Sequence, residues 1–327
     1  MEFLKNNNSN RKKTLPIRGK EIKLPIYFPS ISSVKTGKTS PANYFKILQA
    51  LSPHFLVSAY DIYKSKKREE FIKELKLHIE KDDGAIIILD SGNYEKFWLK
   101  DKNWKVEMFN SILKENICDL AFCYDNLNPK SFKSNVSFIK ESINLSQNCT
   151  KKSTIIPIVH SNKQSLSKTI LNLRNQINFS MVAIPERELG DGIIERVKTI
   201  TKIRKELNDL DTYIYLHILG TGNPLSLILF SFAGADTFDG LEWCQTVVDS
   251  KTALLYHFQQ RDLIIDDCEF CNEPTFNYTI KTFAHNLKFY NAWMSKIQKA
   301  IDTNTEIELL NEYFNPSIVS QLKNIWK

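Results

Sequence analysis

Apolar residues gather along the chain in short continuous runs that alternate with longer segments of helical periodicity. Eight runs rich in β-branched and aromatic residues predict strands, at residues 24–31, 55–60, 85–90, 120–125, 154–160, 180–186, 212–219 and 235–240. These runs are continuously apolar, which indicates parallel strands covered by helices on both faces. The intervening segments predict helices at residues 41–51, 67–81, 104–116, 132–145, 163–177, 193–207 and 224–234.

This order of elements predicts an α/β fold, a (β/α)8 TIM barrel. An open, doubly wound sheet would normally stop at about five to seven strands, whereas eight strand–helix units suit a closed barrel. After the eighth strand the sequence predicts a loop-rich insertion and then two C-terminal helices, at about 284–302 and 305–325, that pack on the barrel. No internal repeat or long linker is evident, so residues 1–327 are expected to form a single domain.

Composition and charge exclude few classes of protein. The 327 residues are 42% apolar and 25% charged, which is ordinary for a globular chain, and the net charge of +7 leans weakly toward a polyanionic partner. The first residues lack the apolar core of a signal peptide, and no run of about 18 apolar residues occurs. Six scattered cysteines do not resemble a secreted disulfide framework. We therefore expect a soluble, cytoplasmic protein without membrane contact.

Polar residues end most of the predicted strands. In an α/β barrel the chemistry lies at the carboxyl ends of the strands, which here carry Asp90, Asp125, His160, Glu186, Gly220 and Asp239. Each residue alone could be a turn or capping residue. Several carboxylates that converge on one mouth would repel one another unless they share a substrate, a metal or a proton. The pattern therefore favours an active site at this end of the barrel.

A second group of residues suggests a metal site after the last strand, within about residues 262–290. Cys268 and Cys271 form a C-x2-C pair, and His285 follows at the start of a predicted helix. Thiolate and imidazole ligands suit tetrahedral zinc, although a pair of reduced thiols is the alternative. A closed structural site needs a fourth ligand, and the candidates are Asp266, Asp267, Glu269, His257 and Cys244.

Motifs along the chain resemble those of the tRNA-guanine transglycosylase superfamily, in the same order. The helix HNLKFYNAWMSKIQKAI (285–301) is similar to the family's histidine-bearing helix, and LDSGNY (89–94) to its DSGG-aromatic motif. The family's FDE, IVQGG and MGVGxP…GxDMFD motifs are matched by FCYDN (122–126), PIVHS (157–161), and HILGTGNP (217–224) with GADTFDG (234–240). The resemblance covers about residues 14–302.

The resemblance implies a role for each matched residue. Asp239 would be the nucleophile, Asp90 the general acid/base, and Asp125 the partner of a guanine-like base. The remaining substrate-binding residues would be Tyr94, whose ring stacks on the base, Ser91 beside it, His160 at the position of a base-contacting glutamine, Glu186 and Gly220. Cys268, Cys271 and His285 match three of four structural zinc ligands. The family's first cysteine falls on Asp266, which becomes the first choice for the fourth ligand.

The implied reaction replaces guanine in a nucleic acid by a 7-deazaguanine base, here 7-cyano-7-deazaguanine, through a covalent aspartyl–nucleotide intermediate. Members that act on tRNA carry a Pro-Thr-Arg segment after the nucleophile, whereas GLEWCQTVVDSKT (240–252) contains no arginine. The paired glycines that present backbone groups to the base are replaced around Pro185 and Glu186. These departures favour the DpdA-like branch, which modifies DNA in bacteria and phage-infected cells.

Two alternatives stay open: a transglycosylase acting on tRNA, and a non-catalytic partner subunit that keeps the fold and the zinc. The resemblance also allows a helper ATPase and a homodimer formed near the zinc region.

Overall fold

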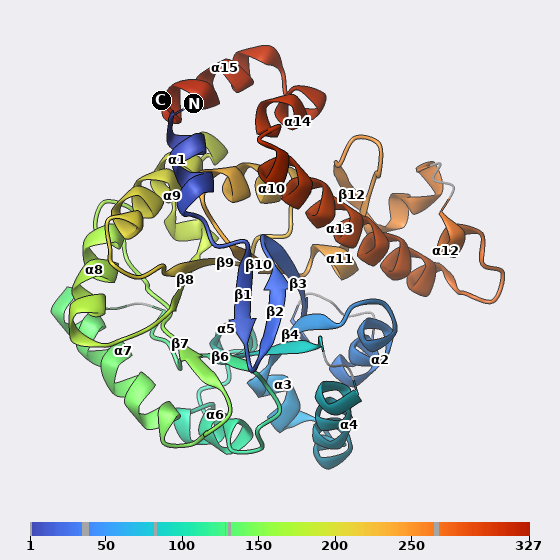
Figure 1. Ribbon diagram of the computed structural model, residues 1–327. Helices are drawn as coiled ribbons and strands as arrows, with labels where there is room; N and C mark the ends of the chain where they lie inside the picture. The colour runs from blue at the N-terminus through green and yellow to red at the C-terminus, as the bar shows by residue number, and fades with distance from the viewer. Residues whose placement is uncertain (1, 35–38, 82–83, 128, 130–131, 265–267) are drawn as a thin grey trace.

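The computed structural model describes residues 2–34, 39–81, 84–127, 129, 132–264 and 268–327. Its centre is a parallel sheet of eight strands, which curls into a nearly closed barrel flanked by helices (Figure 1). The strands are β3 (Ile26–Ile31), β4 (His54–Ser58), β5 (Ile86–Asp90), β6 (Leu120–Phe122), β7 (Thr154–Ile156), β8 (Met181–Pro185), β9 (Tyr215–Leu219) and β10 (Thr237–Gly240). A parallel bridge between Ile158 and Ala183 joins the two outer strands, β7 and β8. The predicted TIM barrel is confirmed.

The seven predicted helices surround the sheet, with bounds close to those expected. They are α2 (Pro41–Leu51), α4 (Arg68–Lys81), α6 (Val106–Leu113), α7 (Phe132–Gln147), α8 (Leu166–Gln176), α9 (Ile193–Asn208) and α10 (Pro224–Ala233). Both α2 and α10 begin with a proline after a capping residue, Ser40 or Asn223, whose side chain accepts hydrogen bonds from the first turn. Short helices that were not predicted follow β4, β5 and β8, namely α3 (Ala59–Lys64), α5 (Asn93–Trp98) and η1 (Glu186–Glu188).

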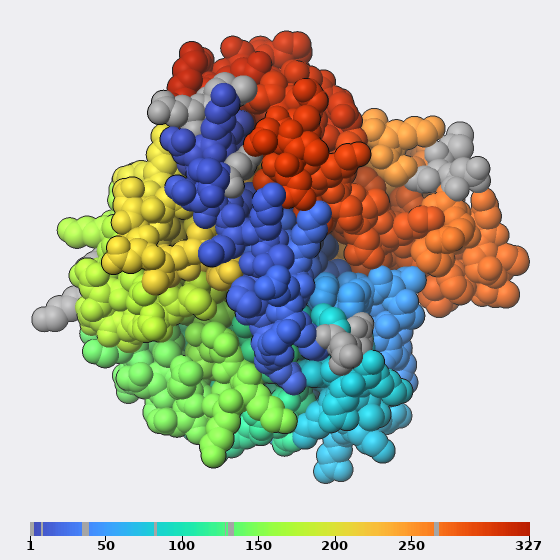
Figure 2. Space-filling model, viewed as in Figure 1, coloured from blue at the N-terminus to red at the C-terminus, as the bar shows by residue number. Residues whose placement is uncertain are grey.

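An N-terminal segment covers the amino end of the barrel. It consists of α1 (Glu2–Asn10) and an antiparallel hairpin of β1 (Thr14–Ile17) and β2 (Lys20–Lys23), and it crosses the face seen in Figures 1 and 2. In the hairpin turn, Arg18 forms an ion pair of 2.5 Å with Asp119, which directly precedes β6. The hairpin therefore closes the end of the barrel opposite to the predicted active site.

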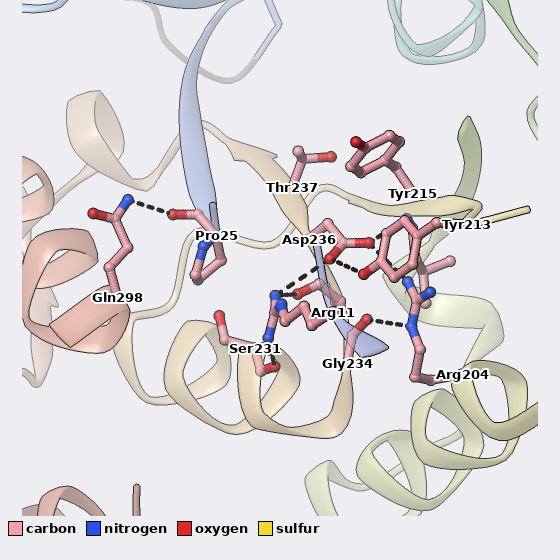
Figure 3. Close-up of polar contacts among 12 residues, drawn as sticks. Arg11, Pro25, Arg204, Tyr213, Tyr215, Ser231, Gly234, Asp236, Thr237 and Gln298 are labelled. Carbon is pink, nitrogen blue, oxygen red and sulfur yellow. Dashed lines mark hydrogen bonds and ion pairs between the residues drawn. The ribbon is translucent and has the colours of Figure 1, made fainter. Parts of the chain in front are cut away.

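The two aspartates of the segment GADTFDG lie at opposite ends of β10. Asp236, at the amino end, is buried and accepts hydrogen bonds from Arg204 (2.7 Å), Tyr213 (2.7 Å) and a backbone amide of β9 (Figure 3). Arg11, from the segment after α1, lies 3.4 Å from the same carboxylate. Asp236 thus holds the N-terminal segment and α9 to the barrel, and it is Asp239 that reaches the carboxyl end.

The chain after β10 packs along one side of the barrel. It contains α11 (Glu242–Gln245), β11 (Thr246–Val248), β12 (Leu255–His257), η2 (Phe258–Leu263), α12 (Glu269–Asn272), α13 (Tyr278–Thr303), α14 (Glu306–Tyr313) and α15 (Pro316–Ile325). The C-terminal helices are confirmed, but α13 begins at its Asn277 cap rather than near residue 284. The helix predicted over 305–325 is two helices, because Pro316 starts a new one after the Asn315 cap. None of the described helices is both long and apolar enough to cross a membrane.

Candidate active site and metal centre

Asp90, Asp125 and Asp239 reach the carboxyl end of the barrel from β5, the loop after β6, and β10. Burial, followed by the nearby charges of Glu95 and Asp125, raises the pKa of Asp90 well above its ordinary value, and the charge of Asp239 adds to the shift. The side chain accepts one hydrogen bond, of 3.0 Å, from the backbone amide of Gly92. The structure therefore gathers the three predicted aspartates and gives Asp90 surroundings that favour its protonated form.

Asp239 has more hydrogen-bond donors than Asp90. Its Oδ2 accepts a hydrogen bond of 2.8 Å from the hydroxyl of Ser30 on β3. Its Oδ1 lies 3.1 Å from Nε2 of His217 on β9 and 3.1 Å from the backbone N of Gly220. Donors from both strands that flank β10 thus fix the orientation of the Asp239 carboxylate. The predicted Gly220 meets Asp239 through its backbone amide.

His217 connects Asp239 to the interior of the barrel. The imidazole is fully buried, and its Nδ1 lies 2.8 Å from the hydroxyl of Thr237. With Nε2 as the donor to Asp239, Nδ1 can accept a hydrogen bond from the Thr237 hydroxyl. Neither His217 nor Ser30 was singled out from the sequence. The available signal was a polar residue inside an apolar strand, YLHIL (215–219).

Asp125, His160 and Glu188 form a chain of hydrogen bonds. Nε2 of His160 lies 2.8 Å from Oδ2 of Asp125, and Nδ1 lies 2.6 Å from Oε1 of Glu188. Burial alone would lower the pKa of His160, but the hydrogen bonds and charges of the two carboxylates raise it to about 9. At neutral pH the ring is therefore an imidazolium, and both of its N–H groups face carboxylates.

Asp125 is held in its charged form. Burial alone would raise the pKa of Asp125, but the hydrogen bond and charge of His160, with hydrogen bonds from Asn93 and Ser91, keep it below its ordinary value. Ser91 Oγ donates to Oδ1 at 2.7 Å, and Asn93 Nδ2 donates to the same oxygen at 2.8 Å. The predicted Ser91 and His160 thus both contact Asp125. An open hollow of about 740 Å³ lies beside His160, with Lys163 and Arg187 in its wall.

The turn between β5 and α5 requires glycine. Gly92 has a φ of +80°, and a Cβ atom at this position would lie 2.7 Å from Cβ and 2.9 Å from the backbone N of Tyr60. This turn directs Asp90 and Ser91 into the mouth and places Tyr94 on the exposed face of α5. The predicted aromatic ring therefore stands at the rim, one turn away from Asp90.

Glu95, which the sequence analysis did not select, is buried on the inner face of α5. It accepts hydrogen bonds from Ser32 (2.5 Å) and Ser58 (2.7 Å), while burial and then the charge of Asp61 raise its pKa to about 7. Burial also raises the pKa of Asp61 to about 6. The charge of Glu95 acts on Asp90, and the charge of Asp90 in turn contributes to the raised pKa of Asp61. The mouth is therefore more acidic than the strand-end residues alone indicated.

Glu186 and Glu242 lie on the opposite side of the mouth from Glu95. Glu186 pairs with Arg196 at 2.5 Å and accepts a hydrogen bond of 3.0 Å from Thr221. Burial is the main cause that raises the pKa of Glu242 to about 7, and the charges of Glu186 and Asp239 act in the same direction. The predicted Glu186 is thus already paired through both of its oxygens.

Cys268, Cys271 and His285 lie close enough to bind a metal ion, since their ligand atoms are all within 4.8 Å of one another. Sγ of Cys271 is 3.5 Å from Nδ1 of His285, and Nε2 of His285 is 2.8 Å from the carbonyl oxygen of Val248. A hydrogen bond from Nε2 to a carbonyl leaves Nδ1 as the metal-binding nitrogen. The two sulfurs lie 2.8 Å apart, and a tetrahedral zinc ion would separate them to roughly 3.8 Å. The donor set fits zinc.

The first choice for a fourth ligand, Asp266, lies outside the described residues, as does Asp267. Among the residues that the structure does describe, no further His, Cys, Asp or Glu joins the group. Glu269 pairs with Lys288, Cys244 donates to the carbonyl of Leu241, and His257 caps η2. None of these three alternatives therefore completes the site.

Comparison with models of known protein families found none that matches this chain. Comparison with curated proteins found no match either.

Proposed function

We propose that this protein is a transglycosylase that exchanges guanine in DNA for a 7-deazaguanine base, with 7-cyano-7-deazaguanine as the incoming base. The observation that carries the proposal is a pair of aspartates in unlike surroundings. Asp239 has three donors around its two oxygens, whereas Asp90 has one donor and a pKa raised by burial and by neighbouring carboxylates. Two carboxyl groups in such different surroundings suit a nucleophile and a general acid.

The proposed reaction has two displacements at C1′ of the nucleotide. Asp239 attacks C1′, the bond from C1′ to N9 of guanine breaks, and Asp90 gives its proton to the leaving base. The nitrogen of the incoming base then attacks C1′, the bond from C1′ to the Asp239 oxygen breaks, and Asp90 takes the proton of that nitrogen. Two inversions retain the configuration at C1′ and leave the phosphodiester backbone intact.

Asp125 is the group we assign to base recognition. A guanine-like base offers N–H donors along its Watson–Crick edge, and a carboxylate is a strong acceptor for them. Ser91, Asn93 and His160 orient Asp125 and keep it ionised. Tyr94, at the rim, would stack on the base once the nucleotide has left its duplex. Zinc bound by Cys268, Cys271 and His285 would supply a structural crosslink rather than chemistry at C1′.

We propose DNA rather than tRNA as the substrate because of residues 240–252, the segment that follows Asp239. In this chain Trp243, Cys244, Val247 and Val248 are buried there, and Trp243 donates a hydrogen bond of 2.9 Å to the carbonyl of Ser30. The segment therefore packs against the barrel and α13 and offers no arginine to an RNA loop.

Mass spectrometry of nucleosides from total DNA and total tRNA tests the proposal. Cells would produce the wild-type protein, Asp239→Ala, or the control Asp211→Ala, which removes an exposed aspartate before the amino end of β9. All cells would receive the deazaguanine precursor, together with any genes that lie next to the gene for this protein. We expect a deazaguanine nucleoside in DNA that Asp239→Ala abolishes and Asp211→Ala preserves. A signal confined to tRNA would contradict the choice of DNA, and no signal in either would favour a non-catalytic subunit.

A further inference from the structure

Helix α5 has a buried face and an unusually apolar exposed face. Asn93 and Glu95 point inward and are hydrogen-bonded to the site. On the outer face and in the residue that follows, Tyr94 is 36% exposed, Phe97 58%, Trp98 45% and Leu99 50%. Apolar side chains gathered at the surface in this way mark an interaction site more often than scattered ones do.

The exposed rings touch one another and form one surface. The ring centroids of Tyr94 and Trp98 are 6.3 Å apart at an interplanar angle of 65°, and those of Phe97 and Trp98 are 5.5 Å apart at 85°. Trp98 thus joins the ring at the rim of the mouth to rings farther out. The surface is continuous with the active site, because Tyr94 lies in the helix that starts from the Gly92 turn.

Exposed lysines follow these rings in the sequence. Residues 96–105 contain four lysines and a single acidic residue, Asp101. Lys100, Lys102 and Lys105 are exposed, whereas Asp101 is paired with Lys64 at 2.7 Å and accepts a hydrogen bond of 3.0 Å from Tyr60. The surface is therefore cationic as well as aromatic. Aromatic rings bordered by lysines suit a single nucleic-acid strand, whose bases stack on the rings while its phosphates meet the ammonium groups.

We propose that Phe97, Trp98 and Leu99, with Lys100, Lys102 and Lys105, form a docking surface for the DNA strand next to the nucleotide that enters the mouth. We call it the α5 patch; Tyr94 is not part of it. A nucleotide that leaves its duplex breaks the stacking of its neighbours. The α5 patch replaces that stacking for the adjacent bases. This inference rests on the proposed function, because it takes the strand from the substrate named there.

Binding of a short fluorescein-labelled single-stranded oligodeoxynucleotide, followed by fluorescence anisotropy, tests the α5 patch. Phe97→Ala and Trp98→Ala should each raise the Kd about tenfold, which is typical for the loss of one stacking ring. Lys100→Ala combined with Lys102→Ala should flatten the dependence of the Kd on salt. Leu145→Ala, which truncates a 47% exposed side chain on α7, is the matched control and should bind like the wild type.

Trp98 also gives a direct optical signal. The chain has five tryptophans, and the other four are at most 3% exposed. Stacked bases should therefore quench fluorescence in the wild type, and Trp98→Phe should remove most of that quenching. Unchanged affinity and unchanged quenching in these variants would overturn the inference. So would tighter, patch-dependent binding of tRNA, or a change of the variants from dimer to monomer, which would identify the patch as an interface between copies.

Failure of this inference can be distinguished from failure of the proposed function. If DNA modification depends on Asp239 but the patch variants bind DNA normally, only the docking surface is wrong. If the patch binds DNA as expected but the wild type modifies no DNA, only the proposed reaction is wrong.

Discussion

A buried imidazole, that of His217, is one of the three groups that hold the Asp239 carboxylate in place. Its Nε2 is 3.1 Å from Asp239 Oδ1, and Thr237 fixes the other side of the ring. The phenylalanine ring of His217→Phe fills similar space but cannot donate a hydrogen bond. We expect kcat of the proposed base exchange to fall roughly hundredfold, because Asp239, the proposed nucleophile, would lose its reactive geometry. The KM for the incoming base should change little.

The control for this prediction is His217→Gln, whose amide can still donate to Asp239. It should recover part of the lost kcat. If His217→Phe retains the wild-type kcat, the ring has no positioning role.

His160 should make the stability of the protein depend on pH in the alkaline range. Its pKa is raised to about 9 in the folded chain, whereas an unfolded histidine loses its proton near pH 6.5. The stabilisation from the imidazolium is therefore complete below about pH 6.5 and is lost as the pH rises through about 9. The quantity to compare is the free energy of unfolding of the wild type minus that of His160→Gln. We expect this difference to fall by on the order of 2 kcal/mol between pH 6 and pH 10.

Urea denaturation of both proteins at the two pH values measures this difference. Because the other titrating groups are common to both proteins, their effects largely cancel. A difference that does not shrink with rising pH would contradict an imidazolium between Asp125 and Glu188.

At the residue scale, the sequence predicted the acidic strand ends and some of the residues that hold them, namely Ser91, His160 and Gly220. It did not predict Ser30, His217 or Glu95. Asp90, Asp125 and Asp239 follow apolar runs, so the barrel rule locates them. Ser30 and His217 lie within strands, and Glu95 lies within a helix. Whether such a residue faces the mouth depends on the tilt and stagger of the barrel, which no local pattern encodes.

The candidate metal site lies between η2 and the first turns of α13. Among the described residues of this stretch, the only α-helix before α13 is α12, four residues long, whereas α13 is long and partly buried against the barrel. We expect purified protein to contain one zinc ion per chain, measured by mass spectrometry of metals without prior exposure to chelator. Cys271→Ser should lose the metal and lower the Tm by about 5 °C, because a ligand that binds only the folded state stabilises it.

Cys149→Ser is the matched control, since Cys149 lies after α7 and its thiol donates to the carbonyl of Leu145. It should keep the metal and the wild-type Tm. Protein that contains no metal at all would contradict the assignment of Cys268, Cys271 and His285.

At the element scale, long periodic segments were predictable and short ones were not. The helices α2, α9 and α10 are close to their predicted ranges because each has a clear periodic pattern or a proline-containing cap. Helix α5 has six residues, and its inner and outer faces are set by contacts with the strands. Pro316 is visible in the sequence, but apolar residues on both sides of it predict one continuous helix.

For the whole molecule, the network around Asp236 ties together segments that are far apart in the chain. Arg11, Arg204 and Asp236 are all buried. Asp236→Asn would leave two guanidinium groups without their carboxylate, and breaking a buried ion pair in this way costs about 3–5 kcal/mol. Urea denaturation should show this loss in the free energy of unfolding.

Asp302→Asn provides the comparison for this prediction. Asp302 pairs with Lys13 and Lys23 at the surface. An exposed pair of this kind contributes at most about 1 kcal/mol. If the two variants lose the same free energy of unfolding, burial is not the reason that the Asp236 network stabilises the fold.

The barrel as a whole was predictable, but the N-terminal segment was not. Eight apolar runs with helices between them define the barrel without any knowledge of contacts. Helix α1 has the polar sequence EFLKNNNSN, and its place depends on Phe3, Leu4 and Arg11 meeting distant parts of the chain. Such tertiary contacts outweigh local propensity and leave no periodic signal.

The hairpin that covers the amino end has a consequence for the order of events during turnover. The β1–β2 hairpin closes that end, and buried side chains such as Phe28, Phe122 and His217 fill the barrel interior. A base should therefore enter and leave through the mouth at the carboxyl end. In the proposed exchange, guanine should therefore depart before its replacement enters. Initial rates measured at several fixed DNA concentrations should give parallel double-reciprocal lines, the signature of a ping-pong scheme. Intersecting lines would mean that both bases occupy the mouth together.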